Sequence, residues 1–525
     1  MRRTRFKSWA GTLAALLVTA TLALPAAASV KPHAPVLPGK NGGHLTVVSV
    51  QASGAWVGMD PFLPNIPPGT AAMFPVWDPL FNMNPATNSI ELNSLATGYH
   101  VTGGGLAVTI ELRKHVKFQD GTAFNAAAVV WNLERYASAT VNSECTSYLA
   151  VVTSVVASGP YTVVIHLSAR DAGLIPLLAT QQCALMVSPT AYQAEGASFT
   201  NDPVGTGPYK FQSGTPGSVA NFVRWTGYWG GKPHLDEVTV ETVTSDANAL
   251  TALQSGTAQA WLSFVDIGAV PQILQAKADP SLRVSHGVAA SITYVTFSFT
   301  HSPFDNALLR QAVTYATNPK AIDAALYHNV FKPVEGVFPP ASWAYSGNLR
   351  GYPSYNPAKA QAIVKQLGGS VTFNMLVSAV PTQVQLADAL QAQWQAVGIN
   401  AQIQPVTTAT LITNLHALTY AALQINSPGL PDPDNIAYRW FYSGSALTQN
   451  GLKSAVADKL ILAARSSYGR AARVADYHKL NNYLSSVTPW DDIAATNPYN
   501  IVAKNLHGLP ATPYSLFPWE SAYFS

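Results

Sequence analysis

The chain carries few charged side chains. Asp, Glu, Lys and Arg make up 11% of its 525 residues, against about 25% in ordinary soluble proteins. Two explanations are open. In an acidic exterior, carboxylates would become protonated, so a surface that relied on them would lose its charge pattern. Alternatively, the composition reflects drift in an alanine-rich genome.

Cysteine is almost absent, since Cys145 and Cys183 are the only two. With no cysteine before Cys145, we expect no lipid anchor at a cleavage site near the N-terminus. Two widely spaced cysteines also make neither a zinc cluster nor a thiol nucleophile. In an exported chain they favour one disulfide, whose loop of roughly 40 residues would stabilise the fold by about 4 kcal/mol. Two buried free thiols are the alternative.

The common catalytic motifs are missing. There is no phosphate-binding loop, no H-E-x-x-H zinc motif and no G-x-S-x-G nucleophile elbow, and Pro208 and a missing third glycine rule out a dinucleotide loop at 205–208. The 12 histidines are dispersed. We interpret the neighbouring acids Asp491-Asp492 and Asp432/Asp434 as solvated or capping. The sequence therefore predicts no enzyme, catalytic residue, metal or cofactor.

The N-terminus has the three parts of a secretory signal peptide. Four basic residues precede an uncharged run from Ser8 to Leu24, and small residues follow, so we expect cleavage of 1–28 and export to the extracellular or cell-envelope space. A membrane anchor is the alternative. Cleavage lowers Lys+Arg from 30 to 26 against 27 acidic residues. The remaining chain is nearly neutral, and nothing indicates a nucleic-acid partner.

Local patterns in the second half predict alternating strands and helices. Asn356-Pro357 begins a helix that ends at Gly368, and alternate apolar residues over 371–377 predict a strand. A helix through Leu390 and Trp394 and a strand over 399–403 complete a strand-helix-strand unit, whose strands are normally parallel.

Other helix starts lie earlier in the chain. Asp305 is a candidate N-cap, Asn318-Pro319 begins the following helix, and Ser245 or Asp246 begins one that Gly256 closes. These elements predict an α/β fold. About 497 residues remain after the signal, which is more than one hydrophobic core accommodates. We therefore expect two or more lobes, with the chain crossing between them several times.

Several segments, in order, resemble the peptide/nickel-type solute-binding proteins of ABC transporters, family 5. The resemblance rests on Leu95–Tyr99, Val108–Gly121, Pro203–Tyr209, Tyr228–Pro233, Pro303–Val313 and Asp432–Asn435. It implies a monomeric extracellular protein that captures a small solute and delivers it to ABC permease subunits with their ATPases.

The resemblance also implies the fold: a periplasmic-binding-protein-like α/β fold of type II, cluster C, with three lobes and a ligand cleft between two of them. Lobe I would combine 41–77, 196–288 and 495–525. Lobe II would be 78–195, and lobe III 289–494. The chain would cross between outer lobes at a hinge.

The departures from the family bear on the ligand. Peptide-binding members usually have a Trp, and three residues later an Asp that meets the peptide ammonium group, where this chain has Asn426 and Gly429. Losing that charge disfavours a peptide with a free amino terminus. A sugar, a blocked peptide or another neutral solute would fit. We predict a pocket lined by Asn426 and four further residues, Trp56, Tyr294, Ser427 and Asp432. The Trp56 and Tyr294 rings would stack on the ligand.

Two other functions stay open. The fold would also serve a ligand sensor that signals to a membrane receptor. A secreted hydrolase would need a nucleophile and base, or a metal set, that the sequence does not contain.

Overall fold

The computed structural model describes residues 41–525, except 51–57, 63–73, 85–86, 139–143, 181, 264–266, 348, 428, 430–431 and 513–516. The predicted signal peptide and Trp56 lie outside this part. Strands and helices are mixed along the described chain, so the predicted α/β class is confirmed. No helix in the described part has the length and apolar character needed to cross a membrane.

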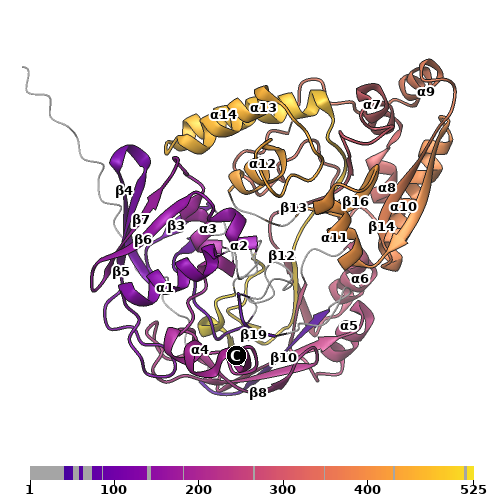
Figure 1. Ribbon diagram of the computed structural model, residues 1–525. Helices are drawn as coiled ribbons and strands as arrows, with labels where there is room; N and C mark the ends of the chain where they lie inside the picture. The colour runs from indigo at the N-terminus through magenta and orange to yellow at the C-terminus, as the bar shows by residue number, and fades with distance from the viewer. Residues whose placement is uncertain are drawn as a thin grey trace, which may run out of the picture. The chain divides into compact units, whose positions relative to one another are not determined.

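The described strands form three large sheets (Figure 1). The first has seven strands in the order β12-β18-β11-β1-β10-β9-β8. In it β1 is parallel to β10 and β11, and the other pairs are antiparallel. Its strands are β1 (His44–Val50), β8 (Tyr209–Thr215), β9 (Val219–Arg224), β10 (Glu237–Val243), β11 (Ala260–Ser263), β12 (Leu282–His286) and β18 (Tyr499–Ala503).

The second sheet is antiparallel, with the order β4-β5-β7-β6, and the third has the mixed order β15-β14-β16-β13-β17. Two small hairpins pair β2 (Asn82–Asn84) with β3 (Ser89–Glu91) and β19 (Leu506–His507) with β20 (Tyr523–Phe524). The strands of the two larger sheets are β4 (Ala96–Thr102), β5 (Ala107–Leu112), β6 (Val152–Gly159), β7 (Thr162–Leu167), β13 (Ser291–Phe297), β14 (Val371–Ser378), β15 (Ile399–Val406), β16 (Ala422–Asn426) and β17 (Trp490–Thr496).

The α-helices of the described chain lie between these strands in the sequence. They are α1 (Ala126–Ala137), α2 (Glu144–Tyr148), α3 (Leu174–Thr180), α4 (Pro189–Glu195), α5 (Asp246–Gln254), α6 (Val270–Ala278), α7 (Ala307–Ala316), α8 (Pro319–Leu326), α9 (Pro357–Gln366), α10 (Pro381–Gln395), α11 (Thr408–Ala417), α12 (Asp434–Phe441), α13 (Ala455–Ser466) and α14 (Arg470–Val487).

Side-chain caps explain where several helices begin. The Asn356 side chain accepts a hydrogen bond from Lys359 N at 3.0 Å at the start of α9, and Ser245 caps α5 in the same way. Both starts were predicted. The unit β14-α10-β15 also forms as expected, with its two strands parallel.

Two sequence interpretations were wrong. The cap of α7 is Asn306 and not Asp305, since the Asn306 side chain accepts from Leu308 N at 2.9 Å. Asp491 and Asp492 are not solvated or capping: they lie in the middle of β17 and are 1% and 2% exposed. Both faces of this strand are covered, so adjacent side chains are both buried.

The glycines at 205 and 207 are required by packing against residues 75–77. A Cβ atom on Gly205 would lie 2.2 Å from Val76 O, and one on Gly207 would lie 2.6 Å from Pro75 O. Any side chain at either position would therefore push residues 205–207 away from residues 75–77.

The described core contains three large apolar clusters, and two of them each join one large sheet to another. One combines the seven-stranded sheet with the four-stranded sheet, for example Val47 with Ile110. A second combines the seven-stranded and five-stranded sheets, for example Trp261 with Val295. A third lies within 289–495. Among the described residues, no apolar cluster joins 78–195 to 289–494.

Candidate ligand-binding site

Two of the predicted site residues lie at the end of β16 and directly after it. Asn426 ends β16 and is the register partner of Thr293 on β13. Ser427 continues the pairing: its amide donates to Ile292 O at 2.7 Å, and its Oγ accepts from Ile292 N at 2.8 Å. The Ser427 side chain is therefore held by the sheet, and it is 2% exposed.

Asn426 leaves an acceptor unused. Its Oδ1 is buried and has no hydrogen-bond partner among the described residues, and the same holds for Thr293 Oγ1 on the neighbouring strand. An unsatisfied buried acceptor costs about 1–3 kcal/mol. A donor group supplied from outside the described chain would recover that free energy.

Tyr294 lies in the core of this structure. Its ring stacks on Trp490 with centroids 3.7 Å apart, its phenol donates to Gln449 Oε1 at 2.8 Å, and it is 0% exposed. The role of Tyr294 in stacking on a ligand stays a prediction, as does that of Trp56, which lies outside the described residues.

Asp432 is bound on both carboxylate oxygens by Arg473 of α14, at 2.6 and 2.9 Å. Asp432 Oδ1 also accepts from Asp434 N at 3.0 Å, at the start of α12. The Asp432 side chain thus anchors α12 to α14 in this conformation, and its predicted contact with ligand is untested.

Arg465 of α13 extends the charged network to residues 78–195. Its guanidinium pairs with Asp434 and with Asp171, and all three side chains are at least nine-tenths buried. Asp171 Oδ1 accepts from Gly173 N at 2.9 Å. Burial raises the pKa of Asp434 to about 6; Arg465 opposes that shift and Asp171 adds to it. Arg465 keeps its charge, because the two carboxylates raise its pKa despite burial.

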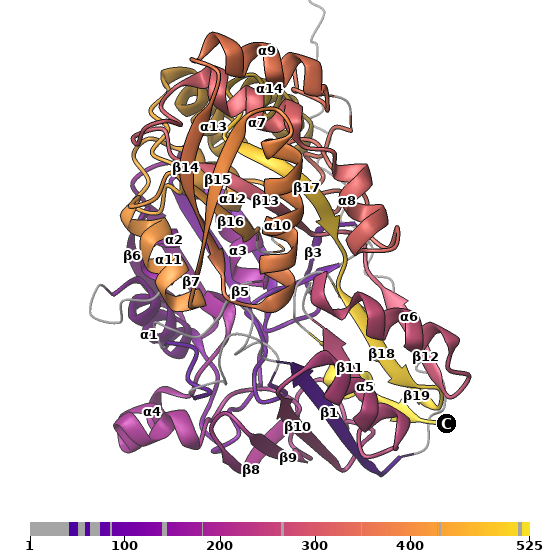
Figure 2. The same cartoon turned by 90° about the vertical axis from the view of Figure 1, so that its right-hand side faces the viewer.

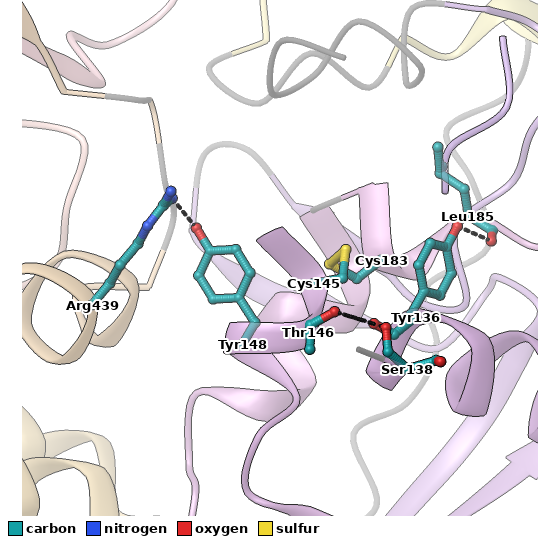
Figure 3. Close-up of a disulfide and its surroundings, with 8 residues drawn as sticks. All are labelled: Tyr136, Ser138, Cys145, Thr146, Tyr148, Cys183, Leu185 and Arg439. Carbon is teal, nitrogen blue, oxygen red and sulfur yellow. Dashed lines mark hydrogen bonds between the residues drawn. A yellow bond between two sulfur atoms is a disulfide. The ribbon is translucent and has the colours of Figure 1, made fainter. Parts of the chain in front are cut away.

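Further polar contacts join 78–195 to 289–494. Ala172 N donates to Arg465 O at 2.9 Å, and Tyr468 Oη donates to Gly105 O at 3.1 Å. Arg439 of α12 donates to Tyr148 Oη (Figure 3). The two parts therefore meet through ion pairs and hydrogen bonds.

A small cavity lies within this contact. It has room for roughly one or two water molecules, so a solute of ordinary size requires its walls to separate. Asn435 is 5% exposed, and its Nδ2 has no partner among the described residues. The lining residues are Ser147, Tyr148, Asp171, Gly173, Leu177, Asp434, Asn435, Tyr438, Arg439, Ser445, Leu447 and Arg465.

The predicted disulfide is present next to this cavity. Cys145 and Cys183 are bonded, with their Cα atoms 5.6 Å apart, and both are fully buried. Cys145 lies on α2, three residues before Tyr148, which points toward Arg439 (Figure 3). The bond therefore anchors the short helix that supplies one wall.

Sequence reasoning missed Asp171, Arg465 and Arg473. The only signal for the two arginines is their spacing: each occupies a position on α13 or α14 where an apolar residue would face the core. The pairing with Asp171 has no local signal.

Comparisons with known proteins identify the family. Residues 92–447 match the model of the bacterial extracellular solute-binding proteins, family 5 Middle. This covers more than half of the chain, which therefore belongs to that family.

No group of three or more metal-ligating side chains occurs in the described chain.

Curated relatives include the glutathione-binding protein GsiB of Salmonella choleraesuis (strain SC-B67), which is 33% identical over 315 residues. That alignment covers 59% of this chain and 60% of the relative. The chain thus spans less than two thirds of the length of the curated relatives it matches.

Solved structures show the fold over nearly the whole chain. DppA of Helicobacter pylori, in complex with the peptide STSA, superposes with a TM-score of 0.80 at 21% identity, covering 92% of this chain and 98% of that one. AgaA of A. tumefaciens R10, in complex with agropinic acid, gives 0.78 at 22%, covering 92% and 99%. The fold is that of the periplasmic binding proteins, as the resemblance implied.

Proposed function

We propose that this chain is an exported solute-binding protein that captures a small solute and delivers it to the permease of an ABC importer, without catalysing a reaction. Family membership supports the class, because the family consists of binding proteins. The observation that carries the proposal is the buried polar contact between 78–195 and 289–494, which encloses a cavity beside Asp432–Asn435.

We propose the three lobes at their predicted boundaries. The sheets support this division, since each large sheet takes its strands from one predicted set of residues. The one difference is at β17, whose last two residues, 495–496, pass the predicted boundary of lobe III. Export as a monomer, with 1–28 removed, completes the proposal.

The solute in this proposal is polar and uncharged where it meets the segment 426–435. Gly429 provides no carboxylate for an ammonium group, Asp432 and Asp434 are already paired with arginines, and Asn426 Oδ1 and Asn435 Nδ2 are unpartnered in the described chain. Such a site would pair with one donor and one acceptor, as a hydroxyl or amide provides. Agropinic acid in AgaA supports ligands other than peptides in this fold.

Native mass spectrometry of the protein as secreted tests the proposal, because a retained solute is detected as added mass. Re-adding the identified solute should raise the melting temperature, since binding the native state adds about 2.7 kcal/mol at a hundredfold excess over Kd. Deleting the gene should abolish uptake of that solute. A strain that takes the solute up normally without this protein would contradict delivery to an importer.

A further inference from the structure

Asp491 is an acid without a cationic partner in the core. On β17 it is the register partner of Val295 and lies on the face packed against α7 and α8, whereas Asp492 pairs with Tyr294 on the other face. Asp491 is 1% exposed, and none of the described ion pairs includes it. An ionised carboxylate in such a place has lost its hydration without compensation.

The hydrogen-bond partners of Asp491 are neutral. Thr317 Oγ1, at the end of α7, lies 2.6 Å from Asp491 Oδ2. That same hydroxyl accepts from Trp394 Nε1 of α10 at 2.9 Å and lies 3.1 Å from Val313 O. Trp394 Nε1 can only donate and Val313 O can only accept. The single proton of Thr317 therefore has two candidate acceptors, Val313 O and Asp491 Oδ2.

The neighbouring hydroxyl belongs to Thr314 and is also neutral. Thr314 directs its proton to Arg310 O at 3.3 Å. Asp491 Oδ1 has no partner that meets hydrogen-bond geometry among the described residues. Val313 O already accepts from Thr317 N at 3.1 Å, so a proton on Asp491 could be donated to Thr317 Oγ1 without leaving that carbonyl unpaired.

The titratable groups around Asp491 would oppose its ionisation or lie too far to favour it. Arg310 of α7 turns its guanidinium to Phe304 O and Val487 O. Lys320 of α8 and Lys332, whose backbone pairs with Ala495 of β17, are both exposed. Burial raises the pKa of Asp491 to about 7, with the hydroxyls of Thr317 and Thr314 opposing the shift. The remaining groups on the elements packed around it are acids or phenols: Asp492, Tyr294, Glu335, Tyr352, Asp323 and Asp388.

We propose that Asp491 is carried as an uncharged carboxylic acid that donates its own proton to Thr317, and that its ionisation releases β17 from Thr317 at the end of α7. The cluster is then a pH-sensitive clamp. It is closed in acid, when Asp491 can donate, and opens as Asp491 loses its proton.

The position of Asp491 gives the clamp a consequence beyond its own strand. After β17 the chain passes through Asn497 and Pro498 into β18 of the seven-stranded sheet (Figure 2). Loosening β17 therefore loosens one of the connections between the two sheets. This is independent of which solute the protein binds and of whether it serves an importer.

Infrared spectroscopy of the full exported chain tests the protonation directly. Free aspartic acid ionises near pH 4, so exposed carboxyls are ionised at about pH 6. We expect a protonated-carboxyl band at that pH in the wild type, and we expect Asp491→Asn to remove part of it. Asp388→Asn, which changes an exposed acid on α10, is the matched control and should leave the band unchanged. The absence of any such band in the wild type would overturn the proposal.

Hydrogen exchange tests the clamp. After correction for intrinsic rates, we expect the protection of β17 amides to fall by about tenfold or more between about pH 5 and pH 8 in the wild type. In Asp491→Asn, whose amide can still donate to Thr317, protection should be independent of pH. An equal pH dependence in both proteins would overturn the proposal.

A second variant covers the case in which Asp491→Asn does not fold. Thr317→Val removes the proposed acceptor of the Asp491 proton, so the wild-type carboxyl band should shift in frequency. An unshifted band would show that the acid does not bond to Thr317 and would also overturn the proposal.

Discussion

Asp171 and Arg465, which are 294 positions apart, form an ion pair that is 3% and 8% exposed. The pair joins residues 78–195 to residues 289–494, where no described apolar cluster does so. Ion pairs and hydrogen bonds therefore hold this contact, and each of them is lost when either of its partners is removed.

Removing the Asp171 carboxylate should destabilise the protein. Asp171→Ala leaves Arg465 buried with Asp434 alone, and loss of one partner in a buried network costs up to about 3–5 kcal/mol. Urea unfolding, compared through the midpoint, measures this. Asp476→Ala is the control, because Asp476 pairs with Lys479 on the surface, where a pair is worth about 0–1 kcal/mol. Equal effects of the two variants would contradict the finding.

The Cys145–Cys183 disulfide should be complete in the secreted protein. Thiol labelling of the unreduced, denatured chain should find no free thiol, and two labelled thiols would refute the bond. Replacing both cysteines with serine should lower the free energy of unfolding by about 4 kcal/mol, because the unfolded chain regains the freedom of its closed loop.

Two changes, one at the end of β16 and one shortly after it, test the proposed ligand. Gly429→Asp adds a carboxylate beside the site, so it should weaken an uncharged solute and favour a cationic or free-amine ligand. Asn426→Ala should weaken the natural solute by roughly 1–3 kcal/mol, since it removes an unpartnered buried acceptor.

Calorimetric titration with the solute found by mass spectrometry measures both effects. Unchanged affinity in both folded variants would place 426–429 outside the binding site. If a library of free peptides gave the largest thermal shift of the wild type, the interpretation of Gly429 would be wrong.

Stability should decrease as the pH rises from about 4 to about 7, and Asp78 should contribute. Burial raises its pKa from 3.8 to about 7, although Trp229 Nε1 donates to Asp78 Oδ2 at 2.7 Å. The folded protein then holds a proton that the unfolded chain releases. The contribution of Asp78 is complete below about pH 4 and is lost as the pH passes the folded value.

Denaturation at several pH values measures this slope. In Asp78→Asn, the loss of unfolding free energy between about pH 4 and about pH 7 should be smaller by an amount of the order of a few kcal/mol. The control is Asp236→Asn, which changes a half-exposed acid of the same part of the chain. An Asp78→Asn protein with the wild-type slope would show that Asp78 is ionised in the folded state.

Elements that have a local cause could be predicted from the amino-acid sequence. The caps at Asn356 and Ser245 were predictable because each satisfies an amide three residues away. The parallel pair β14 and β15 followed from a single strand-helix-strand pattern. The disulfide followed from there being only two cysteines in a chain predicted to be exported.

The buried charges could not be predicted, because their positions depend on how distant parts of the chain pack together. Asp491 and Asp492 look like solvated neighbours in the sequence, and their burial depends on helices and loops that cover both faces of β17. Asp171 finds Arg465 across 294 positions, and neither residue has a local pattern that names the other. Side-chain burial and long-range pairing depend on how distant segments pack, and local propensity contains no information about that packing.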